Sequence, residues 1–169
     1  MSVTHTYDVA VRWTGNLGTG TENYRSYSRA HDVLGEGKPA IAASADPAFR
    51  GDPDRWNPEE LLVASVAQCH MLWYLHFCST GGVTVLAYED LAHAVMTMDE
   101  SGGGGRITEV VLRPQVTVAD AATAEKARAL HGKVPAVCFI ARSVNFPVRH
   151  EPVILTGGSP APAPTPAPQ

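Results

Sequence analysis

The segment from Asn57 to His70 constrains the fold of this chain more than any other. Asn57 can accept hydrogen bonds from the first free backbone N–H groups of a helix. Pro58 suits the first helical position, because its missing N–H would have had no helical partner. Glu60 follows Asn57 by three residues, the spacing of a capping box. The sequence therefore predicts a helix that begins at Pro58 and runs to about Cys78.

This predicted helix is apolar or small on every side from Leu61 to Ala67, which is typical of a helix enclosed by protein. It carries a thiol at Cys69. The stretch from Leu61 to Cys78 is also the one candidate membrane span. Three polar side chains interrupt that stretch, and they favour a buried helix over a transmembrane one: Gln68, His70 and His76.

Length and charge exclude several classes of protein. The chain has 169 residues, enough for one domain, and its 13 Lys and Arg against 17 Asp and Glu give a net charge of −4. No basic run or basic-aromatic stripe points to nucleic acid. The opening residues, Met1 to His5, lack the basic and apolar regions of a signal peptide. We therefore expect a cytoplasmic protein that binds neither nucleic acid nor membrane.

Hydrophobic periodicity and turn residues predict an α+β protein. The predicted strands lie at residues 7–13, 24–33, 41–43, 83–86, 91–98, 107–118 and 146–155. Asp120 is a plausible N-cap for a helix at 121–130, and a short helix at 137–143 would hold Cys138. We expect one domain over residues 1–156. Residues 157–169 are rich in Pro and Ala without charge, which predicts a solvated, disordered tail.

Three cysteines without scaffold-like spacing indicate reduced thiols rather than a disulfide framework: Cys69, Cys78 and Cys138. If Cys69 and Cys138 meet in the fold, an oxidant could convert Cys69 to a sulfenic acid that Cys138 resolves as a disulfide. The alternative is that both simply pack. On an ideal helix, Cys78 lies half a turn out of phase with Cys69 and faces away from it, so we interpret Cys78 as a packing residue.

A reactive thiolate needs positive charge nearby, and the loop before the helix offers Arg50 and Arg55. Glu59 could hold either arginine in a fixed orientation. Solvated side chains around a helix cap are the alternative. Glu59 and Cys69 are about 15 Å apart along one helix, so they cannot touch. An arginine must bridge that gap, or a partner helix in a dimer must supply half of the site.

Histidines near the cysteines suggest other chemistry, which their spacing does not support. Cys69 and His70 diverge by about 100° on a helix, and no Cys-x-x-Cys or His-x-x-x-His pair indicates a metal. His70 or His131 could activate Cys69 in a hydrolase, but that needs a third, orienting group. A core or hydrogen-bonded histidine is the simpler interpretation.

Two segments resemble the OsmC/Ohr family, the bacterial osmotically induced and organic hydroperoxide resistance proteins. The first is Asn-Pro-Glu-Glu-Leu-Leu at residues 57–62 followed by Cys69. The second is Val-Cys-Phe-Ile-Ala-Arg-Ser-Val-Asn-Phe-Pro-Val at 137–148. The resemblance extends from Tyr7 to Leu155. It implies an OsmC-like fold, an intertwined homodimer with antiparallel sheets packed around long central helices.

The resemblance also implies a cysteine-based peroxidase that reduces organic hydroperoxides and is reset by an external dithiol, without metal or organic cofactor. Cys69 would be the peroxidatic thiol and Cys138 the resolving thiol. Glu59 would orient an arginine against the thiolate. Arg50 resembles the OsmC-type position best, and Arg55 and Arg29 are alternatives. The chain departs from the family where Phe139, rather than proline, follows the second cysteine.

A second hypothesis from a different class is a non-catalytic protein on the same fold, which binds a small ligand or acts in a stress response. In that case Cys138 need not reach Cys69.

Overall fold

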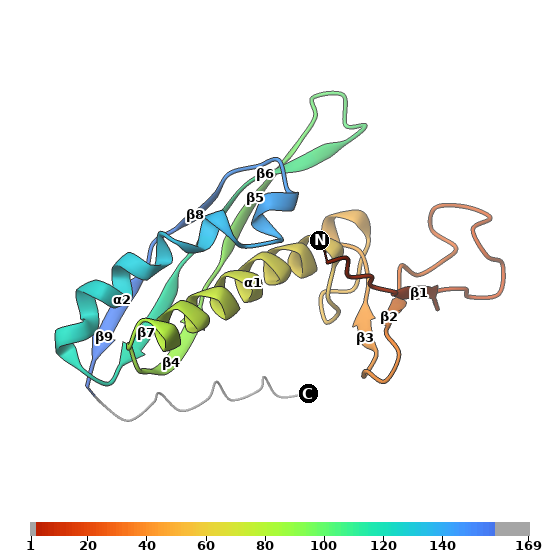
Figure 1. The fold of residues 1–169 in the computed structure, drawn as a ribbon. Helices are drawn as coiled ribbons and strands as arrows, with labels where there is room; N and C mark the ends of the chain where they lie inside the picture. The colour runs from red at the N-terminus through yellow and green to blue at the C-terminus, as the bar shows by residue number, and fades with distance from the viewer. Residues whose placement is uncertain (1–2, 158–169) are drawn as a thin grey trace. The chain divides into compact units, whose positions relative to one another are not determined.

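The computed structural model describes residues 3–157. The predicted disordered tail lies outside these residues, except for Gly157. The chain divides into two compact units, one up to Leu62 and one from Val63 onward (Figure 1).

The N-terminal unit contains a three-stranded antiparallel sheet in the order β1-β2-β3, formed by Ala10–Trp13, His31–Leu34 and Ile41–Ala43. The predicted strand at 41–43 is confirmed, whereas those at 7–13 and 24–33 are shorter than predicted. Polar side chains explain the loss at 24–33. Asn23 accepts a hydrogen bond from the N–H of Arg25, and Ser26 donates to the carbonyl of Gly20, so this backbone forms turns.

The first helix, α1, spans Pro58–Thr80 and begins with the predicted capping box. The N–H of Glu60 donates to Asn57 Oδ1 at 2.8 Å, and the N–H of Asn57 donates to Glu60 Oε2 at 3.2 Å. Gly82, with φ of 72°, allows the chain to turn away after the last helical turn.

In the single chain, α1 buries only one stripe of side chains, spaced four residues apart: Val66, His70, Tyr74 and Cys78. Leu72, between them, is 61% exposed. The predicted enclosure of this helix is therefore incomplete. By length and composition, α1 is long and apolar enough to cross a membrane, and helices in the core of a soluble protein can be equally long and apolar.

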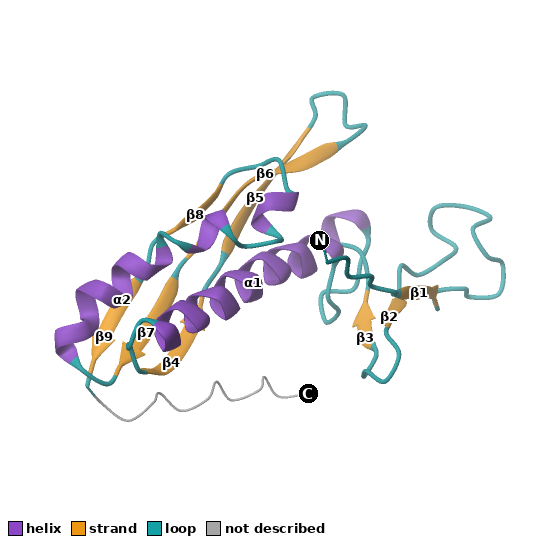
Figure 2. Cartoon of the chain, in the orientation of Figure 1, coloured by secondary structure: helices purple, strands orange, loops and turns teal. Residues whose placement is uncertain are grey.

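The C-terminal unit contains two three-stranded sheets (Figure 2). One has the order β4-β7-β9, formed by Val85–Asp90, Pro114–Val118 and Val153–Thr156; the other has the order β5-β6-β8, formed by His93–Met98, Gly105–Leu112 and Val148–His150. The pairs β4–β7 and β5–β6 are antiparallel, while β8 and β9 add in parallel.

Two predicted strands are each divided in the structure. The strand predicted at 107–118 divides into β6 and β7 at Arg113, whose backbone N–H donates to the side-chain Oδ1 of Asp90 instead of to a backbone carbonyl. The strand predicted at 146–155 divides into β8 and β9 around Pro152, which has no N–H to give to a sheet.

The helix predicted at 121–130 is present in a different form, as a 3₁₀ turn at Ala121–Thr123 followed by α2 at Ala124–His131. Asp120 caps the turn by accepting from the N–H of Ala122 at 2.9 Å. The side chains of α1, α2 and β7 share one hydrophobic core, which includes Tyr74, Val116 and Leu130.

The prediction of a helix at 137–143 is wrong. Cys138 lies in a turn between two 3₁₀ turns, Val134–Ala136 and Ala141–Ser143. Pro135 favours a tight turn, and the N–H of Cys138 donates to the carbonyl of Val134 at 2.9 Å. The N–H of Ala141 lies 3.5 Å from the Cys138 sulfur, so the side chain contributes to the turn.

Candidate active site

The structure brings together the two cysteines that the sequence singles out. Cys69 comes from α1 and Cys138 from the turn after α2, and their sulfur atoms lie 3.0 Å apart. Neither forms a disulfide. Cys69 is half-buried, whereas Cys138 is only 1% exposed. The pair thus combines an accessible thiol with an enclosed one at a distance that a disulfide can close.

Burial, together with the hydrogen bond to Cys69, raises the pKa of the Cys138 thiol to about 11. The backbone N–H groups of Ala141 and Ile140 oppose this effect, because they stabilise negative charge on the sulfur. Cys138 is therefore a protonated thiol at neutral pH, and it must lose that proton to act as a nucleophile.

Three histidines from separate elements gather next to the cysteine pair. His70 of α1 and His131 of α2 share a hydrogen bond of 2.9 Å between Nε2 and Nδ1, and their rings stack. His150 of β8 lies with its ring centre 5.5 Å from that of His70 and 6.0 Å from that of His131. Burial lowers the pKa of His70 to about 4 and that of His131 to about 3. Both rings are therefore neutral at pH 7.

A small cavity connects this cluster to the second thiol. Its lining includes Cys138, His70 and His150, together with apolar side chains such as Val66 and Leu112. Its volume is about 10 Å³, close to the minimum that holds one water molecule.

The third cysteine, Cys78, lies where its helical phase predicts. Cys78 is 1% exposed in the hydrophobic core next to Tyr74, which supports its interpretation as a packing residue. Within residues 3–157, no histidine forms a hydrogen bond with Cys69, so the arrangement that a cysteine hydrolase requires is not found there. No set of three His, Cys, Asp or Glu in this part of the chain is arranged to hold a metal ion.

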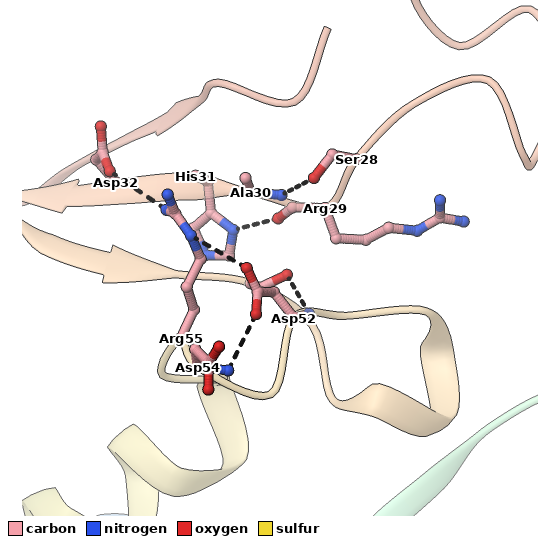
Figure 3. Close-up of polar contacts among 9 residues, drawn as sticks. Ser28, Arg29, Ala30, His31, Asp32, Asp52, Asp54 and Arg55 are labelled. Carbon is pink, nitrogen blue, oxygen red and sulfur yellow. Dashed lines mark hydrogen bonds and ion pairs between the residues drawn. The ribbon is translucent and has the colours of Figure 1, made fainter. Parts of the chain in front are cut away.

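Two of the three candidate arginines are already engaged inside the N-terminal unit. Arg55 forms ion pairs with Asp32 at 3.9 Å and with Asp52 at 3.7 Å (Figure 3). Arg29 donates to the backbone carbonyls of Tyr27 and Tyr24, and its guanidinium carbon lies 4.2 Å from the centre of each of their rings.

Arg50 has a different environment. Its side chain forms no hydrogen bond or ion pair with any described residue, and its guanidinium lies 5.9 Å from the Tyr24 ring centre. Its backbone has φ of 66°, a left-handed conformation that costs a non-glycine residue roughly 1–2 kcal/mol. The next residue must be glycine, because a Cβ at Gly51 would lie 1.5 Å from the carbonyl oxygen of Ala45. The loop therefore holds Arg50 at a fixed, strained position.

Glu59 also has an unpartnered polar atom. Its Oε2 is buried and lacks a hydrogen-bond partner among the residues that the structure describes. An ion pair between Glu59 and an arginine, as the resemblance implies, is not present within residues 3–157. A buried carboxylate oxygen without a partner is costly, and a cation or donor that reached it would be bound strongly.

Aromatic side chains lie near both cysteine-bearing segments. Trp73, one helical turn after Cys69, contacts Phe139, the neighbour of Cys138, with ring centres 5.7 Å apart. Phe77 also packs against Trp73. Phe139 is 65% exposed, so this aromatic patch presents apolar surface to solvent.

The structure combines an α+β fold with two thiols in contact, one of them on a long capped helix. These features define a class of thiol proteins, and similarity to known proteins identifies the family. The profile of the OsmC-like protein family matches residues 51–152, and the chain belongs to this family. An OsmC-like protein of unknown function from Vibrio cholerae has a similar structure, with 31% identity and a TM-score of 0.77. The match covers 89% of this chain and 100% of that one.

Two more distant structures share the fold. An organic hydroperoxide resistance protein from Elizabethkingia anophelis is 17% identical, with a TM-score of 0.66 and coverage of 93% of this chain and 100% of that one. An organic hydroperoxide resistance protein from Legionella pneumophila is 15% identical, with a TM-score of 0.64 and coverage of 91% and 99%. The sequence has no match among curated proteins.

Sequence reasoning missed one residue of this region. His150 lies two residues after Val148, and both line the cavity. The alternation along residues 148–150 was the only sequence signal that could have placed His150 on the inward side of its strand.

Proposed function

We propose that this protein is a thiol-dependent peroxidase that reduces organic hydroperoxides. In the first step, the Cys69 thiolate attacks the terminal peroxide oxygen. The S–O bond forms as the O–O bond breaks, so sulfur is oxidised to a sulfenic acid and the peroxide leaves as an alcohol after taking up one proton. The half-buried position of Cys69 supports its assignment as the attacking thiol.

In the second step, Cys138 attacks the sulfenic sulfur, which forms the Cys69–Cys138 disulfide and releases water. The observation that carries the proposal is the 3.0 Å distance between the two sulfur atoms. A disulfide bond is about 2.05 Å long, so the atoms need to approach by only about 1 Å. An external dithiol then reduces the disulfide and restores both thiols.

The proposed thiolate needs a cation, and Arg50 is our candidate, held by Glu59. Arg50 makes no ion pair within the described residues, while Arg29 and Arg55 are engaged elsewhere. The buried, unpartnered Glu59 Oε2 is a suitable acceptor for its guanidinium. The proposed site is complete when Arg50 bridges Glu59 and Cys69, whether these groups come from one chain or from two.

The proposal includes a cytoplasmic homodimer. Apolar residues on β1 and α1 are exposed in the single chain, among them Val11 at 68% and Leu72 at 61%. A second copy of the chain that packed along these elements would cover them. The aromatic patch of Trp73 and Phe139 supports an organic substrate over hydrogen peroxide, because an apolar substituent can pack there.

The test adds one equivalent of cumene hydroperoxide to the reduced protein and maps its thiols by mass spectrometry. We expect rapid formation of a Cys69–Cys138 disulfide, with Cys78 left as a thiol. Cys69→Ser should abolish turnover, and Cys138→Ser should stop the reaction at a sulfenic acid that a carbon nucleophile traps. Cys78→Ala is the matched control and should keep full activity. Slow oxidation scattered over three cysteines would overturn the proposal.

A further inference from the structure

We propose that His70 and His150 form a proton relay that deprotonates Cys138 when the disulfide closes, and that His131 positions His70 for this role. The inference rests on the proposed disulfide chemistry and assigns further catalytic residues to it.

The need for a relay follows from the environment of Cys138. The thiol is 1% exposed, so bulk water cannot easily take its proton. Burial raises its pKa to about 11, so roughly one molecule in 10⁴ carries the thiolate at pH 7. Cys69, the other group in contact with this sulfur, is the partner in the new bond and cannot also act as the base.

The cavity provides the path. Cys138, His70 and His150 line one space of about 10 Å³, and the remaining lining is apolar. One water molecule in this space would be in a position to carry the proton from sulfur to either ring. His150 is only half-buried, whereas His70 is 3% exposed, so His150 connects the interior to solvent.

The histidine pair has one proton to share in its hydrogen bond. A neutral imidazole donates from one nitrogen and accepts at the other, so one ring of the His70–His131 pair donates across the 2.9 Å contact. His131 Nε2, at the far end, is buried without a partner among the described residues. Tyr74 stacks on His131 with ring centres 3.7 Å apart, which fixes the ring.

Burial keeps the cluster neutral, and the groups that face it act in the same direction. His70, His150 and Arg128 disfavour positive charge on His131, and His150 disfavours it on His70. Tyr74 stays a neutral phenol because burial raises its pKa. Neutral rings do not hold an extra proton at rest, so the cluster can pass a proton without storing it.

Atoms balance in the closing step. The Cys138 sulfur bonds to the Cys69 sulfur, and the bond from Cys69 to the sulfenic oxygen breaks. The thiol proton passes through the cavity water and an imidazole to the departing oxygen, which leaves as water. No net charge remains on the histidines.

The test separates this role from peroxide chemistry by using an aromatic disulfide instead of a peroxide. In a Cys78→Ala background, dithiobis(nitrobenzoate) converts Cys69 to a mixed disulfide. Attack by Cys138 then releases a second coloured thiolate and a proton. The release rate is measured from pH 5 to pH 9 for the parent protein and for His70→Gln, His150→Gln and His76→Gln. His76, exposed on the same helix and outside the cavity, is the matched control.

With an internal base, the parent rate should be nearly independent of pH, because the thiol and the neutral imidazole are together the dominant form across this range. His70→Gln or His150→Gln should slow closure about 10²-fold at pH 7. The variant rate should then rise about tenfold per pH unit, because free thiolate becomes the reactive form. Circular dichroism identifies a variant that fails to fold. In that case, the pH profile of the other variant is compared with the parent profile, and this comparison decides whether the relay exists.

If both folded variants close the disulfide at the parent rate and with the parent pH dependence, the relay is overturned. A parent rate that itself rises tenfold per pH unit would also overturn it. Rapid, histidine-dependent closure in a protein that does not react with hydroperoxides would uphold the relay and reject the peroxidase.

Discussion

Asn57 and Glu60 exchange two hydrogen bonds at the start of α1, and Glu59, between them in sequence, keeps a buried oxygen without a partner among the described residues. Two adjacent glutamates thus have opposite environments. The carboxylate of Glu60 is used to begin a helix, whereas Glu59 is the residue that we propose holds an arginine.

This contrast predicts that stability and activity separate between the two positions. Asn57→Ala should lower the free energy of unfolding by about 1–2 kcal/mol, because the first N–H groups of α1 lose their acceptor. Glu59→Gln should leave stability unchanged or slightly higher, since it removes an unpaired buried charge, but should lower peroxidase activity by roughly tenfold or more. Urea unfolding and peroxide turnover on the same preparations check both. A loss of stability in Glu59→Gln would contradict the assignment.

Arg50→Asn should keep the fold and lose activity. Asparagine tolerates the left-handed backbone at this position, so the loop should survive, whereas the guanidinium is removed. We expect peroxide turnover to fall by about 10²-fold with a change in unfolding free energy below about 0.5 kcal/mol. Arg29→Gln is the comparison. It removes two hydrogen bonds to backbone carbonyls and two ring contacts, so it should lower stability and leave the chemical step intact.

Acid should destabilise the protein through the buried histidines. The folded-state pKa values of His70 and His131, about 4 and about 3, lie below the ordinary histidine pKa of 6.5, so the unfolded chain binds more protons below pH 6.5. Stability is then lost as pH falls from about 6.5 toward the folded values. Between pH 7.5 and pH 5.5 each residue should cost about 1.4 kcal/mol.

Urea unfolding at the two pH values measures this loss. A variant carrying both His70→Leu and His131→Leu removes the two titrating groups and should flatten the dependence. His76→Gln, which changes an exposed histidine on the same helix, should retain it. A parent protein equally stable at both pH values would show that the rings are not buried in neutral form.

Phe139→Ala should reduce the preference for bulky organic peroxides. The side chain supplies exposed apolar surface next to Cys138 and contacts Trp73. Its removal should raise the KM for cumene hydroperoxide by roughly 10-fold, the effect of losing a few buried methylene groups, while the rate with hydrogen peroxide stays the same. Equal losses for both substrates would mean that Phe139 serves the turn around Cys138 and not the substrate.

Local sequence signals predicted the elements whose causes are local. The capping box and α1 follow from adjacent residues, and both are confirmed. The helix predicted around Cys138 failed because Pro135 and the sulfur itself favour tight turns over a regular helix. The divided strands show the same limit, since the bond from Arg113 to Asp90 joins residues far apart in sequence.

The site was predictable only in part, for a similar reason. The family resemblance implied the pairing of Cys69 and Cys138, and the structure places these sulfur atoms in contact. The histidine cluster could not be inferred, because His70, His131 and His150 come from three separate elements and meet only after the sheets and helices pack. The arginine that serves the thiolate remains a prediction.

The position of Cys138 in a turn, outside any regular helix, bears on the proposed disulfide cycle. The backbone of a cysteine in the middle of a helix is fixed by the repeating hydrogen bonds of the turns on both sides. Here a small rotation of the few torsions between Val134 and Ala141 can bring the sulfur the remaining distance, while α1 and the sheets stay unchanged. In the proposed cycle, the oxidised and reduced forms therefore share one scaffold, and only a short hinge deforms.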